Sequence, residues 1–583
     1  MPDFPTESMG VSCDHARGIA PSGESLVVRD PAVLAKFELR RVLERILATA
    51  SQDTGAAEEL LQRVFDTENA TSGGVFSDAI HCDTKFPENA SARNGSRAQC
   101  PRAEGALAKS KGLFSPGDPD YFAPVAIVHR FDLITNMLST CGEYRIVYAK
   151  TSGRSDPKNR VLMIFEGALR NPKPGSMGGC WPLANRIAAW EKEPDRQRVA
   201  AEIEKMYFEG IDGFRPVVHA ESYGFKSSGC TYAGQCGQLR IGAGMQEPWL
   251  FRELTLGEDT MRFQFEPTTV KGSPVPFLFT ASSGEGEHLR NALAFDVPNL
   301  AKPLVPAIVT SLGDSHNAAE STIGGDFAPS YATRIAGSTH GAALLTSLEK
   351  EIGLLKGVEC PASDPLTPTS MLRRASAMSC AGCHAPERLV APDRAIGCGL
   401  TWPKSLGETH IDENGNISEA LRDVFLPHRA RVLTTYLKAC DTIAIRRNFI
   451  PAFGHQCFGA GTMITMADGS KKPIEQIEVG DRVLSYDENE KELVSGEVTK
   501  TFVHPKTDHL VVVNGSLVTT ANHPFWSQGK WVAAEELAVG SPLFDGASVN
   551  AIEMRDGTAT TYNFTVAEYH DYFAGGYLVH NKK

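Results

Sequence analysis

The sequence predicts a multidomain protein with an N-terminal α+β region, a mainly helical segment and a C-terminal all-β domain. With 583 residues the chain is too long for a single hydrophobic core. Its first two thirds mix strand-like and helix-like apolar patterns, a helical stretch broken by Gly and Pro comes next, and short apolar runs between turn dipeptides fill the rest. We expect a flexible N-terminus, an α+β region of unknown function, a helical segment, a linker and an all-β domain, at residues 1–30, 31–365, 366–445, 446–456 and 457–583.

Local patterns justify the α+β assignment. Residues 31–50 repeat apolar side chains at helical spacing after an Asp-Pro start, which predicts an amphipathic helix, and residues 196–208 also predict a helix. The runs 144–148 and 161–165 are rich in β-branched and aromatic residues, which predicts strands. Residues 68–120 are rich in Gly, Ser, Asn and Pro, so we expect a loop there.

Charge and hydropathy argue against two classes of partner. The formal net charge is −12 and no run of Lys or Arg interrupts the acidic balance, so we expect no nucleic-acid binding. No stretch approaches the ~18 consecutive apolar residues of a membrane-spanning helix, so no transmembrane span is expected.

The cysteines and the N-terminus point to different compartments. Of the 13 cysteines, ten lie outside the motifs described below, and this even number favours disulfides in an oxidising compartment. The first residues have neither a basic segment nor an apolar one, so no signal peptide is visible. We favour a periplasmic or extracellular location, with reduced thiols in a cytoplasm as the alternative.

The helical segment carries a motif typical of covalent haem attachment. Cys380 and Cys383 have the spacing that adds to the two haem vinyl groups, and His384 comes next as the axial ligand of the haem iron. This predicts haem c and a cytochrome-c-like fold for the segment. The sixth iron position is either empty or filled by one of several candidates, His410, His428, Met371 and Met378.

Two other interpretations of the same motif stay open. The two cysteines can form a disulfide, or they can supply half of a zinc site. Zinc would need further ligands from a small set, Cys398, His410 and Cys440, at spacings that fit no familiar zinc ribbon. The segment from Arg374 to His428 also loosely resembles exported bacterial proteins that carry a cytochrome c motif.

The start of the all-β domain has the residues needed to cut the backbone without a protease. The thiol of Cys457 can attack the carbonyl of Gln456 through a five-membered ring and exchange the amide for a thioester. His523 can protonate the departing amine, and Thr520, three residues earlier, can hold the carbonyl or its oxyanion. We therefore expect an N–S acyl shift at Cys457.

The end of the domain offers a second cleavage. Asn581 can attack its own carbonyl with its side-chain nitrogen, forming a succinimide and releasing the residues after it. His580 and His570 can polarise that carbonyl and activate the amide. The candidate catalytic residues are therefore Cys457, Thr520, His523, His570, His580 and Asn581.

Four ordered blocks between residues 457 and 581 resemble the Hint domain of hedgehog proteins and inteins, in its bacterial intein-like form. The resemblance implies an all-β horseshoe with self-processing activity. Protein splicing needs a Cys, Ser or Thr after Asn581, but Lys582 stands there, so we expect cleavage instead of splicing. Asn563 stands where many relatives carry Asp, which is expected to slow the first step.

We therefore expect a self-processing precursor in which the tail releases the N-terminal protein or links it to an acceptor. Water, a thiol, an amine or an alcohol can resolve the thioester. Such chemistry needs no cofactor and is a single-turnover, autocatalytic event. The alternative is an exported c-type haem electron carrier or redox sensor with a vestigial Hint tail. A third hypothesis is a disulfide-rich binding protein without haem.

Overall fold

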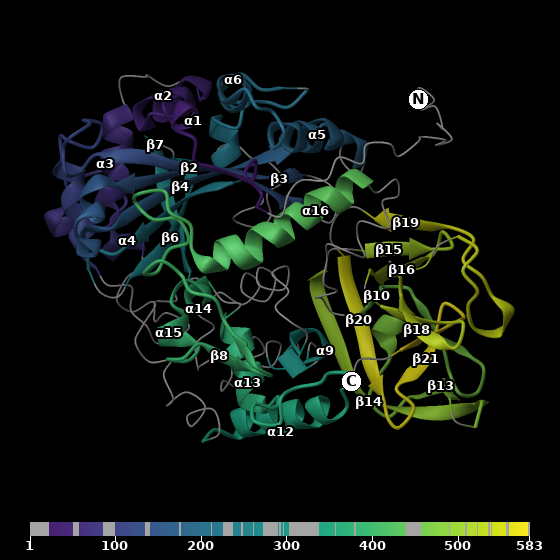
Figure 1. Cartoon of the computed structure of the whole chain (residues 1–583). Coiled ribbons are helices and arrows are strands. Elements are labelled where there is room, and N and C mark those ends of the chain that lie inside the picture. The colour runs from purple at the N-terminus through teal and green to yellow at the C-terminus, as the bar shows by residue number, and fades with distance from the viewer. Residues whose placement is uncertain are drawn as a thin grey trace. The chain divides into compact units, whose positions relative to one another are not determined.

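The computed structural model shows a chain that divides into two compact units, Met1–Ala439 and Cys440–Lys583 (Figure 1). Each unit is described by itself. The structure describes residues 22–50, 57–85, 100–134, 140–173, 177–211, 213–224, 237–246, 249–259, 262–271, 290, 293–294, 297–301, 337–355, 357–377, 380–438, 456–488, 490–507, 510–521, 523–534, 537, 539–555 and 559–580.

The first unit is built on a seven-stranded sheet in which every neighbouring pair is antiparallel and the strand order follows the chain. Its strands are β1 (Val27–Val28), β2 (Phe122–Ile134), β3 (Thr140–Lys150), β4 (Val161–Arg170), β5 (Gln238–Ala243), β6 (Leu250–Asp259) and β7 (Arg262–Lys271). The predicted strands 144–148 and 161–165 lie within β3 and β4. The mixture of helices and sheet confirms the expected combination of α and β structure in this region.

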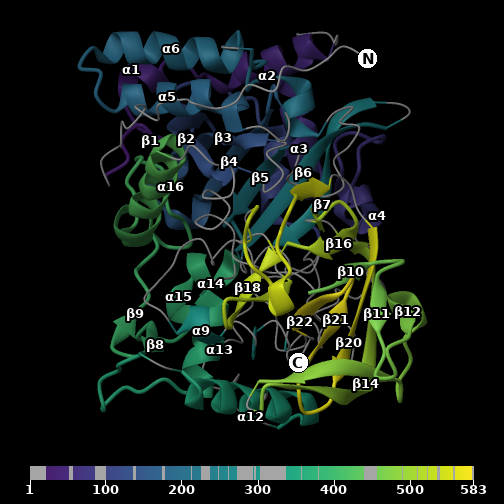
Figure 2. The same cartoon turned by 90° about the vertical axis from the view of Figure 1, so that its right-hand side faces the viewer.

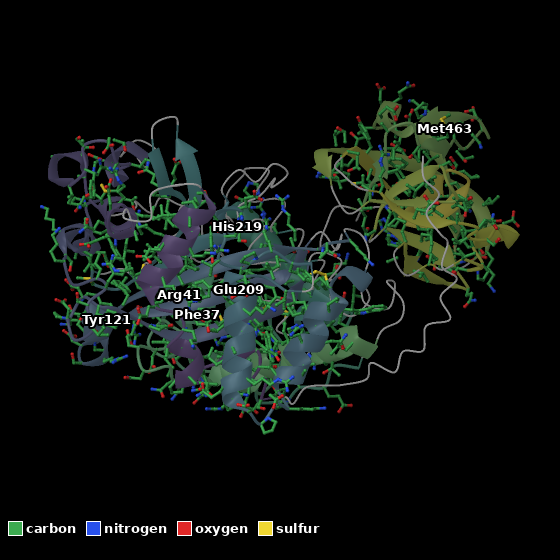
Figure 3. The ribbon with its side chains drawn as sticks, turned by 90° about the horizontal axis from the view of Figure 1, so that it is seen from above. Phe37, Arg41, Tyr121, Glu209, His219 and Met463 are labelled. Carbon is green, nitrogen blue, oxygen red and sulfur yellow. A yellow bond between two sulfur atoms is a disulfide. The ribbon has the colours of Figure 1, made fainter. Side chains whose placement is uncertain are left out.

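Helices cover one face of this sheet (Figures 1 and 2). The helices of the N-terminal half are α1 (Pro31–Leu34), α2 (Leu39–Thr49), α3 (Ala57–Asp66), α4 (Cys82–Lys85), α5 (Trp181–Trp190) and α6 (Arg196–Phe208). The prediction of one helix over 31–50 is wrong at its centre, because the chain breaks between α1 and α2. There Phe37 packs on the ring of Tyr207 at 5.1 Å, and its carbonyl accepts a 2.8 Å hydrogen bond from Tyr148 (Figure 3).

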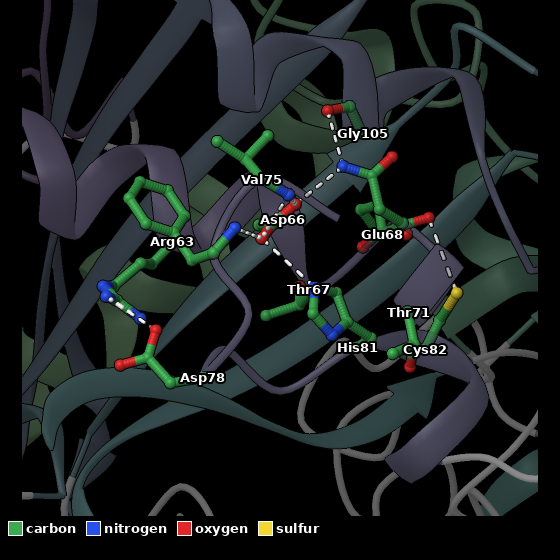
Figure 4. Close-up of polar contacts among 12 residues, drawn as sticks. Arg63, Asp66, Thr67, Glu68, Thr71, Val75, Asp78, His81, Cys82 and Gly105 are labelled. Carbon is green, nitrogen blue, oxygen red and sulfur yellow. Dashed lines mark hydrogen bonds and ion pairs between the residues drawn. The ribbon is translucent and has the colours of Figure 1, made fainter. Parts of the chain in front are cut away.

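The loop after α3 is organised by side chains at the end of that helix (Figure 4). The carboxylate of Asp66 accepts hydrogen bonds from the backbone N–H of Val75 and of Phe76, both at 2.9 Å. The carbonyl of Glu68 accepts from the N–H of Arg102 at 2.9 Å. These contacts hold the turn-rich region predicted between residues 68 and 120 against the end of α3.

The described part of the segment expected to be cytochrome-c-like packs within the first unit. Its elements, together with those just before it, are α9 (Val297–Leu300), α12 (Thr339–Gly353), α13 (Pro368–Ala377), α14 (Cys380–His384), α15 (Pro386–Leu389), β8 (Ala395–Gly397), β9 (Leu400–Thr401) and α16 (Leu426–Lys438). Helix α16 lies on the sheet face opposite α1 and α2. There Tyr436 contacts Phe131 with ring centroids 4.8 Å apart, and Arg429 lies 3.8 Å from Asp132.

Three disulfides join described cysteines of the first unit: Cys82–Cys100, Cys141–Cys180 and Cys360–Cys398. They confirm that part of the expected disulfide set is present. Among the described residues, no helix combines the length and the apolar character that crossing a membrane requires.

The second unit is all-β, as predicted, and consists mainly of two antiparallel sheets (Figure 2). The first, in the order β13-β14-β20-β10-β16-β15-β19, contains Arg482–Asp487, Glu492–Thr507, Ala559–Val566, Phe458–Gly459, Leu517–Thr520, Leu510–Val513 and Ile552–Arg555. The second, β12-β11-β21-β22-β17-β18, contains Lys471–Pro473, Met463–Thr465, Asp571–Ala574, Tyr577–His580, Pro524–Ser527 and Lys530–Ala533. The core is formed by buried side chains of both sheets, among them Phe458, Val498, Phe525, Phe564 and Val579.

Candidate functional site

The peptide bond between Gln456 and Cys457 enters the second unit at the middle of its larger sheet. Cys457 is fully buried and directly precedes β10, which pairs with β16 on one side and β20 on the other. In this register Phe458 lies opposite Thr519 and Tyr562. The neighbours of these two partners, Thr520 and Asn563, are thereby brought to the bond that the sequence predicts to be cut.

Thr520 holds the nitrogen side of this bond. The N–H of Cys457 donates a 3.0 Å hydrogen bond to Oγ1 of Thr520, and the N–H of Thr520 donates to the carbonyl of Cys457 at 2.9 Å. The sequence led us to expect Thr520 at the carbonyl of Gln456. The structure places it instead at the amide nitrogen, which is the leaving group of an N–S acyl shift.

Asn563 holds the carbonyl side of the same bond, and the sequence analysis did not foresee this. Its Nδ2 donates to the carbonyl oxygen of Gln456. Its Oδ1 accepts from the N–H of Phe564 at 2.8 Å and from the hydroxyl of Tyr572 at 2.7 Å. Both acceptor contacts fix the amide so that Nδ2 faces the carbonyl. The neutral amide of asparagine can therefore donate a hydrogen bond to the carbonyl of Gln456.

His523 is fully buried in the same region, and its ring lies 4.1 Å from the ring of Phe458. Its backbone N–H donates to the carbonyl of Thr520 at 3.0 Å, so a tight turn joins the two candidate residues. Burial, together with the nearby His580, lowers the pKa of His523 to about 3. The imidazole is therefore neutral near pH 7, which suits it to accept a proton from a thiol before passing it on.

The candidate residues at the end of the chain are only partly described. His580 ends β22 and lies opposite Asp571 in the register, with its ring centroid 5.0 Å from the ring of Trp531. His570 directly precedes β21 and has a left-handed backbone, with φ 58°. Asn581 lies outside the described residues. The structure thus brings Cys457, Thr520, His523 and His580 into one region.

Asp571 is a buried carboxyl group that the sequence analysis did not single out. Its Oδ1 accepts a 2.8 Å hydrogen bond from the N–H of Tyr486. Burial, helped by the carboxylates of Glu488 and Asp487, raises the pKa of Asp571 to about 7, against the lowering effect of that hydrogen bond. Deprotonation therefore introduces a buried negative charge beside the strand that carries His580.

We expect Asp571 to lower the free energy of unfolding of the second unit as pH rises from about 4 to about 7, while His523, with its lowered pKa, acts in the opposite direction. The folded state holds the Asp571 proton up to a pKa of about 7, whereas the ordinary value is 3.8. The folded state therefore binds more protons in this window, and the loss amounts to about 4 kcal/mol. Calorimetry at pH 4 and pH 8 of Cys457→Ala chains with and without Asp571→Asn measures this Asp571 contribution as the difference between the two chains. Asp571→Asn should remove most of it, and an equal loss in both chains would contradict the assignment.

The haem motif lies in the first unit, and its described members have close neighbours. The Cys380 side chain lies outside the described residues. Sγ of Cys383 is 3.3 Å from Nε2 of His410, and Nδ1 of His384 is 3.1 Å from the carbonyl of Glu408. Burial lowers the pKa of His384 to about 3, so its imidazole is neutral.

These contacts restrict the possible cofactor arrangements. The ring centroids of His384 and His410 are 4.5 Å apart. His384 would hold the iron if haem is bound, and the ring of His410 lies so close to it that no iron fits between the two imidazoles in this arrangement. Cys398 is in a disulfide and does not fit as a zinc ligand. Haem attachment itself stays a prediction. Among the described residues, no group of three or more His, Cys, Asp or Glu side chains is arranged to hold a metal ion.

Comparison with known proteins places a family match on the second unit. Residues 463–582 match the pretoxin HINT domain family, and the match begins six residues after Cys457. A curated relative, the DNA-directed RNA polymerase III subunit rpc2 of Dictyostelium discoideum, is 27% identical over 111 residues, which are 18% of this chain. The chain spans only 7% of the length of that protein.

Two solved structures are also similar over part of the chain. One is a bacterial intein-like domain from Clostridium thermocellum, 33% identical over 22% of this chain and 100% of that domain, with a TM-score of 0.20. The other is the DnaB intein from Synechocystis sp. PCC 6803, 20% identical over 22% of this chain and 100% of that chain, also with a TM-score of 0.20. At these TM-scores the likeness adds nothing to the fold described above. The family match shows that the C-terminal unit contains an all-β Hint-type domain at residues 463–582.

Proposed function

We propose that the second unit cuts the chain between Gln456 and Cys457 and thereby releases the N-terminal protein, alone or joined to an acceptor. The proposal rests on two side-chain hydrogen bonds to one peptide bond, one to its N–H and one to its carbonyl. Thr520 accepts from its N–H at 3.0 Å, and Asn563 donates to its carbonyl oxygen. A peptide bond inside a sheet normally pairs with backbone groups, whereas this one is held by two side chains beside a buried thiol.

In the first step the sulfur of Cys457 attacks the carbonyl carbon of Gln456. The thiol proton passes to the neutral imidazole of His523, and the developing oxyanion is stabilised by Nδ2 of Asn563. The C–N bond then breaks, and the proton is returned to the leaving nitrogen. The product is a thioester between Gln456 and Cys457, with a free amino group on Cys457.

In the second step an external nucleophile resolves the thioester. Water gives a free carboxylate on Gln456, while a thiol, amine or alcohol gives the corresponding adduct. At the other end, Asn581 can cyclise to a succinimide and release the residues that follow it. His580 and His570 are proposed to assist that step. The three described disulfides support a location in an oxidising compartment.

Intact mass of the purified chain tests the first cleavage. Incubation with hydroxylamine or a small thiol at neutral pH should give a fragment that ends at Gln456 and carries the added nucleophile. Cys457→Ala should give no such fragment, because no sulfur is then placed beside the carbonyl. The mass of the C-terminal fragment reports whether the residues after Asn581 are lost.

A matched control separates a general effect on the unit from loss of the nucleophile. Met463→Ala changes an exposed side chain of the same unit and should cleave like the parent chain. If the Cys457→Ala chain gives the same fragment in equal amount, a separate protease makes the cut. Absence of any thioester-dependent fragment from the parent chain after days in hydroxylamine would refute the proposal.

A further inference from the structure

The second unit carries solvent-exposed aromatic and apolar side chains that the proposed cleavage does not use. Tyr486 and Leu493 are direct partners across β13 and β14, and Trp526 and Trp531 are direct partners across β17 and β18. Direct partners in an antiparallel pair point to the same face of their sheet. Leu493 is 55% exposed, and the other three side chains are half-buried, so solvent reaches all four. We call these four residues the aromatic patch.

Ring contacts join the aromatic patch into one surface. The ring centroids of Tyr486 and Trp526 are 6.5 Å apart, and those of Trp526 and Trp531 are 4.8 Å apart. The half-buried ring of Phe544 packs against Tyr486 at 4.7 Å. Apolar side chains that gather on the surface in this way, with polar residues around them, are typical of a binding surface for another molecule.

Carboxylates border the aromatic patch. The hairpin between β13 and β14 contains Asp487, Glu488, Glu490 and Glu492 against one lysine. Asp487 lies directly opposite Glu492 in the register, and Oε1 of Glu488 accepts a 3.1 Å hydrogen bond from Nε1 of Trp531. Like charges in direct cross-strand positions repel each other, and a bound cation relieves that repulsion. Among the described residues, no ion pair to a lysine or arginine involves Glu488 or Glu492. The charge of this border therefore complements a cationic partner.

One end of the aromatic patch borders the residues to which the proposed function assigns the chemistry. The ring of Trp531 lies 5.0 Å from the ring of His580. His580 in turn lies near the imidazole of His523, whose pKa it helps to lower. A partner held on the aromatic patch is therefore held beside the cleavage machinery, where an acceptor for the thioester is needed.

We propose that the aromatic patch and its carboxylate border bind a lysine-bearing polypeptide, and that a lysine of this polypeptide is the acceptor that resolves the thioester. The rings pack against the apolar side chains and lysine stems of the partner, while the carboxylates attract its ammonium groups. The inference rests on the proposed function, because the thioester between Gln456 and Cys457 must form first.

The transfer to lysine needs no further reactant. The neutral Nε of the lysine attacks the thioester carbonyl, the carbon–sulfur bond breaks, and a proton of the amine passes to the sulfur. The products are an amide that joins the main-chain carbonyl of Gln456 to the lysine, and the thiol of Cys457.

Two assays with the full chain test binding and transfer separately. The probe is an N-terminally acetylated, fluorescent peptide of alternating lysine and phenylalanine. Anisotropy with the Cys457→Ala chain measures binding, which should weaken as salt is added. Intact mass of the parent chain measures transfer, and the fragment that ends at Gln456 should carry the added mass of the peptide. The same peptide with acetylated lysines has neither the charge nor the nucleophile and should give neither signal.

Variants locate the binding surface. Trp531→Ala should weaken binding about 10-fold, as expected for an aromatic anchor of an interface. Glu492→Lys reverses an exposed charge of the border, should also weaken binding, and stays informative if Trp531→Ala fails to fold. Val503→Ala, at a 58% exposed side chain further along β14, is the matched control and should bind like the parent. Each transfer rate is divided by the hydroxylamine-dependent release of the same chain, so that a general defect in cleavage cancels.

Failure of this inference differs from failure of the cleavage itself. If hydroxylamine releases the N-terminal protein but the lysine peptide neither binds nor becomes joined to it, the inference is overturned and the cleavage stands. If hydroxylamine releases nothing, the cleavage is wrong, and the acceptor role is overturned with it even where the peptide binds. Unchanged binding by both Trp531→Ala and Glu492→Lys would place the peptide elsewhere and would also overturn the inference.

Discussion

Replacing Asn563 with alanine is expected to slow release of the N-terminal protein by about 10²–10³-fold, the usual cost of losing one oxyanion donor. Nδ2 of Asn563 donates to the oxygen of Gln456 that becomes negatively charged when Cys457 attacks. The donor is already oriented before reaction, because the hydroxyl of Tyr572 and the N–H of Phe564 occupy the other end of the amide. Single-turnover rates of hydroxylamine-dependent release, followed by intact mass, measure the loss.

The conservative variants distinguish donation from a merely structural role. Tyr572→Phe removes one contact that orients Asn563 and should cost less than Asn563→Ala, with the unit still folded. Asn563→Asp keeps the size of the side chain but presents a carboxylate to the same oxygen, so we expect slow cleavage near pH 7. This is the reverse of the sequence-based expectation that Asn563 slows the first step. Faster cleavage by Asn563→Asp would contradict the role of the amide and favour an acid–base role at this position.

More of the chemistry of the second unit than of its geometry could be predicted from the sequence. Cys457 and His523 belong to short blocks whose residue types are informative by themselves. The role of Asn563 depends on the pairing of β10 with β20, two strands separated by about a hundred residues in the chain. The patterns in a single sequence do not show such pairing. From sequence alone Asn563 is therefore interpreted only by its difference from relatives, and its contact with Gln456 is not predicted.

In the first unit, two of the strands that the sequence did not predict, β5 and β6, carry an ion pair. The predicted strand 161–165 in β4 is a continuous apolar run, whereas β5 and β6 place Arg240 and Glu253 opposite each other, with Glu253 buried. A hydropathy pattern predicts that a strand with charged residues is solvent-exposed, even where their ion pair is buried. The same reasoning explains the helix predicted over 31–50. Its apolar periodicity continues through the break, and only the tertiary contacts of Phe37 show where the chain turns.

Buried charge is also the source of the largest stability effect that we expect. Glu68→Gln should destabilise the first unit by about 3–5 kcal/mol, because it breaks a buried ion pair and removes one of the two carboxylates, Glu68 and Glu104, that offset the charge of Arg252. Nε of Arg252 lies 3.0 Å from Oε1 of Glu68, and both side chains are buried. Burial raises the pKa of Glu68 and lowers that of Arg252, so each depends on the other to stay ionised. Chemical denaturation of the full chain in the Cys457→Ala background measures the change.

Two companion chains show whether the charge or the packing is responsible. Glu68→Leu combined with Arg252→Met removes both charges at similar volume and should recover most of the lost stability. Lys36→Ala breaks an exposed ion pair, 3.4 Å from Glu204 with the Lys36 side chain 44% exposed, and should cost less than about 1 kcal/mol. If the double variant is as unstable as Glu68→Gln alone, the unit depends on the shape of these side chains and not on their pairing. If Lys36→Ala costs as much as Glu68→Gln, burial of the Glu68–Arg252 pair is not what makes it sensitive.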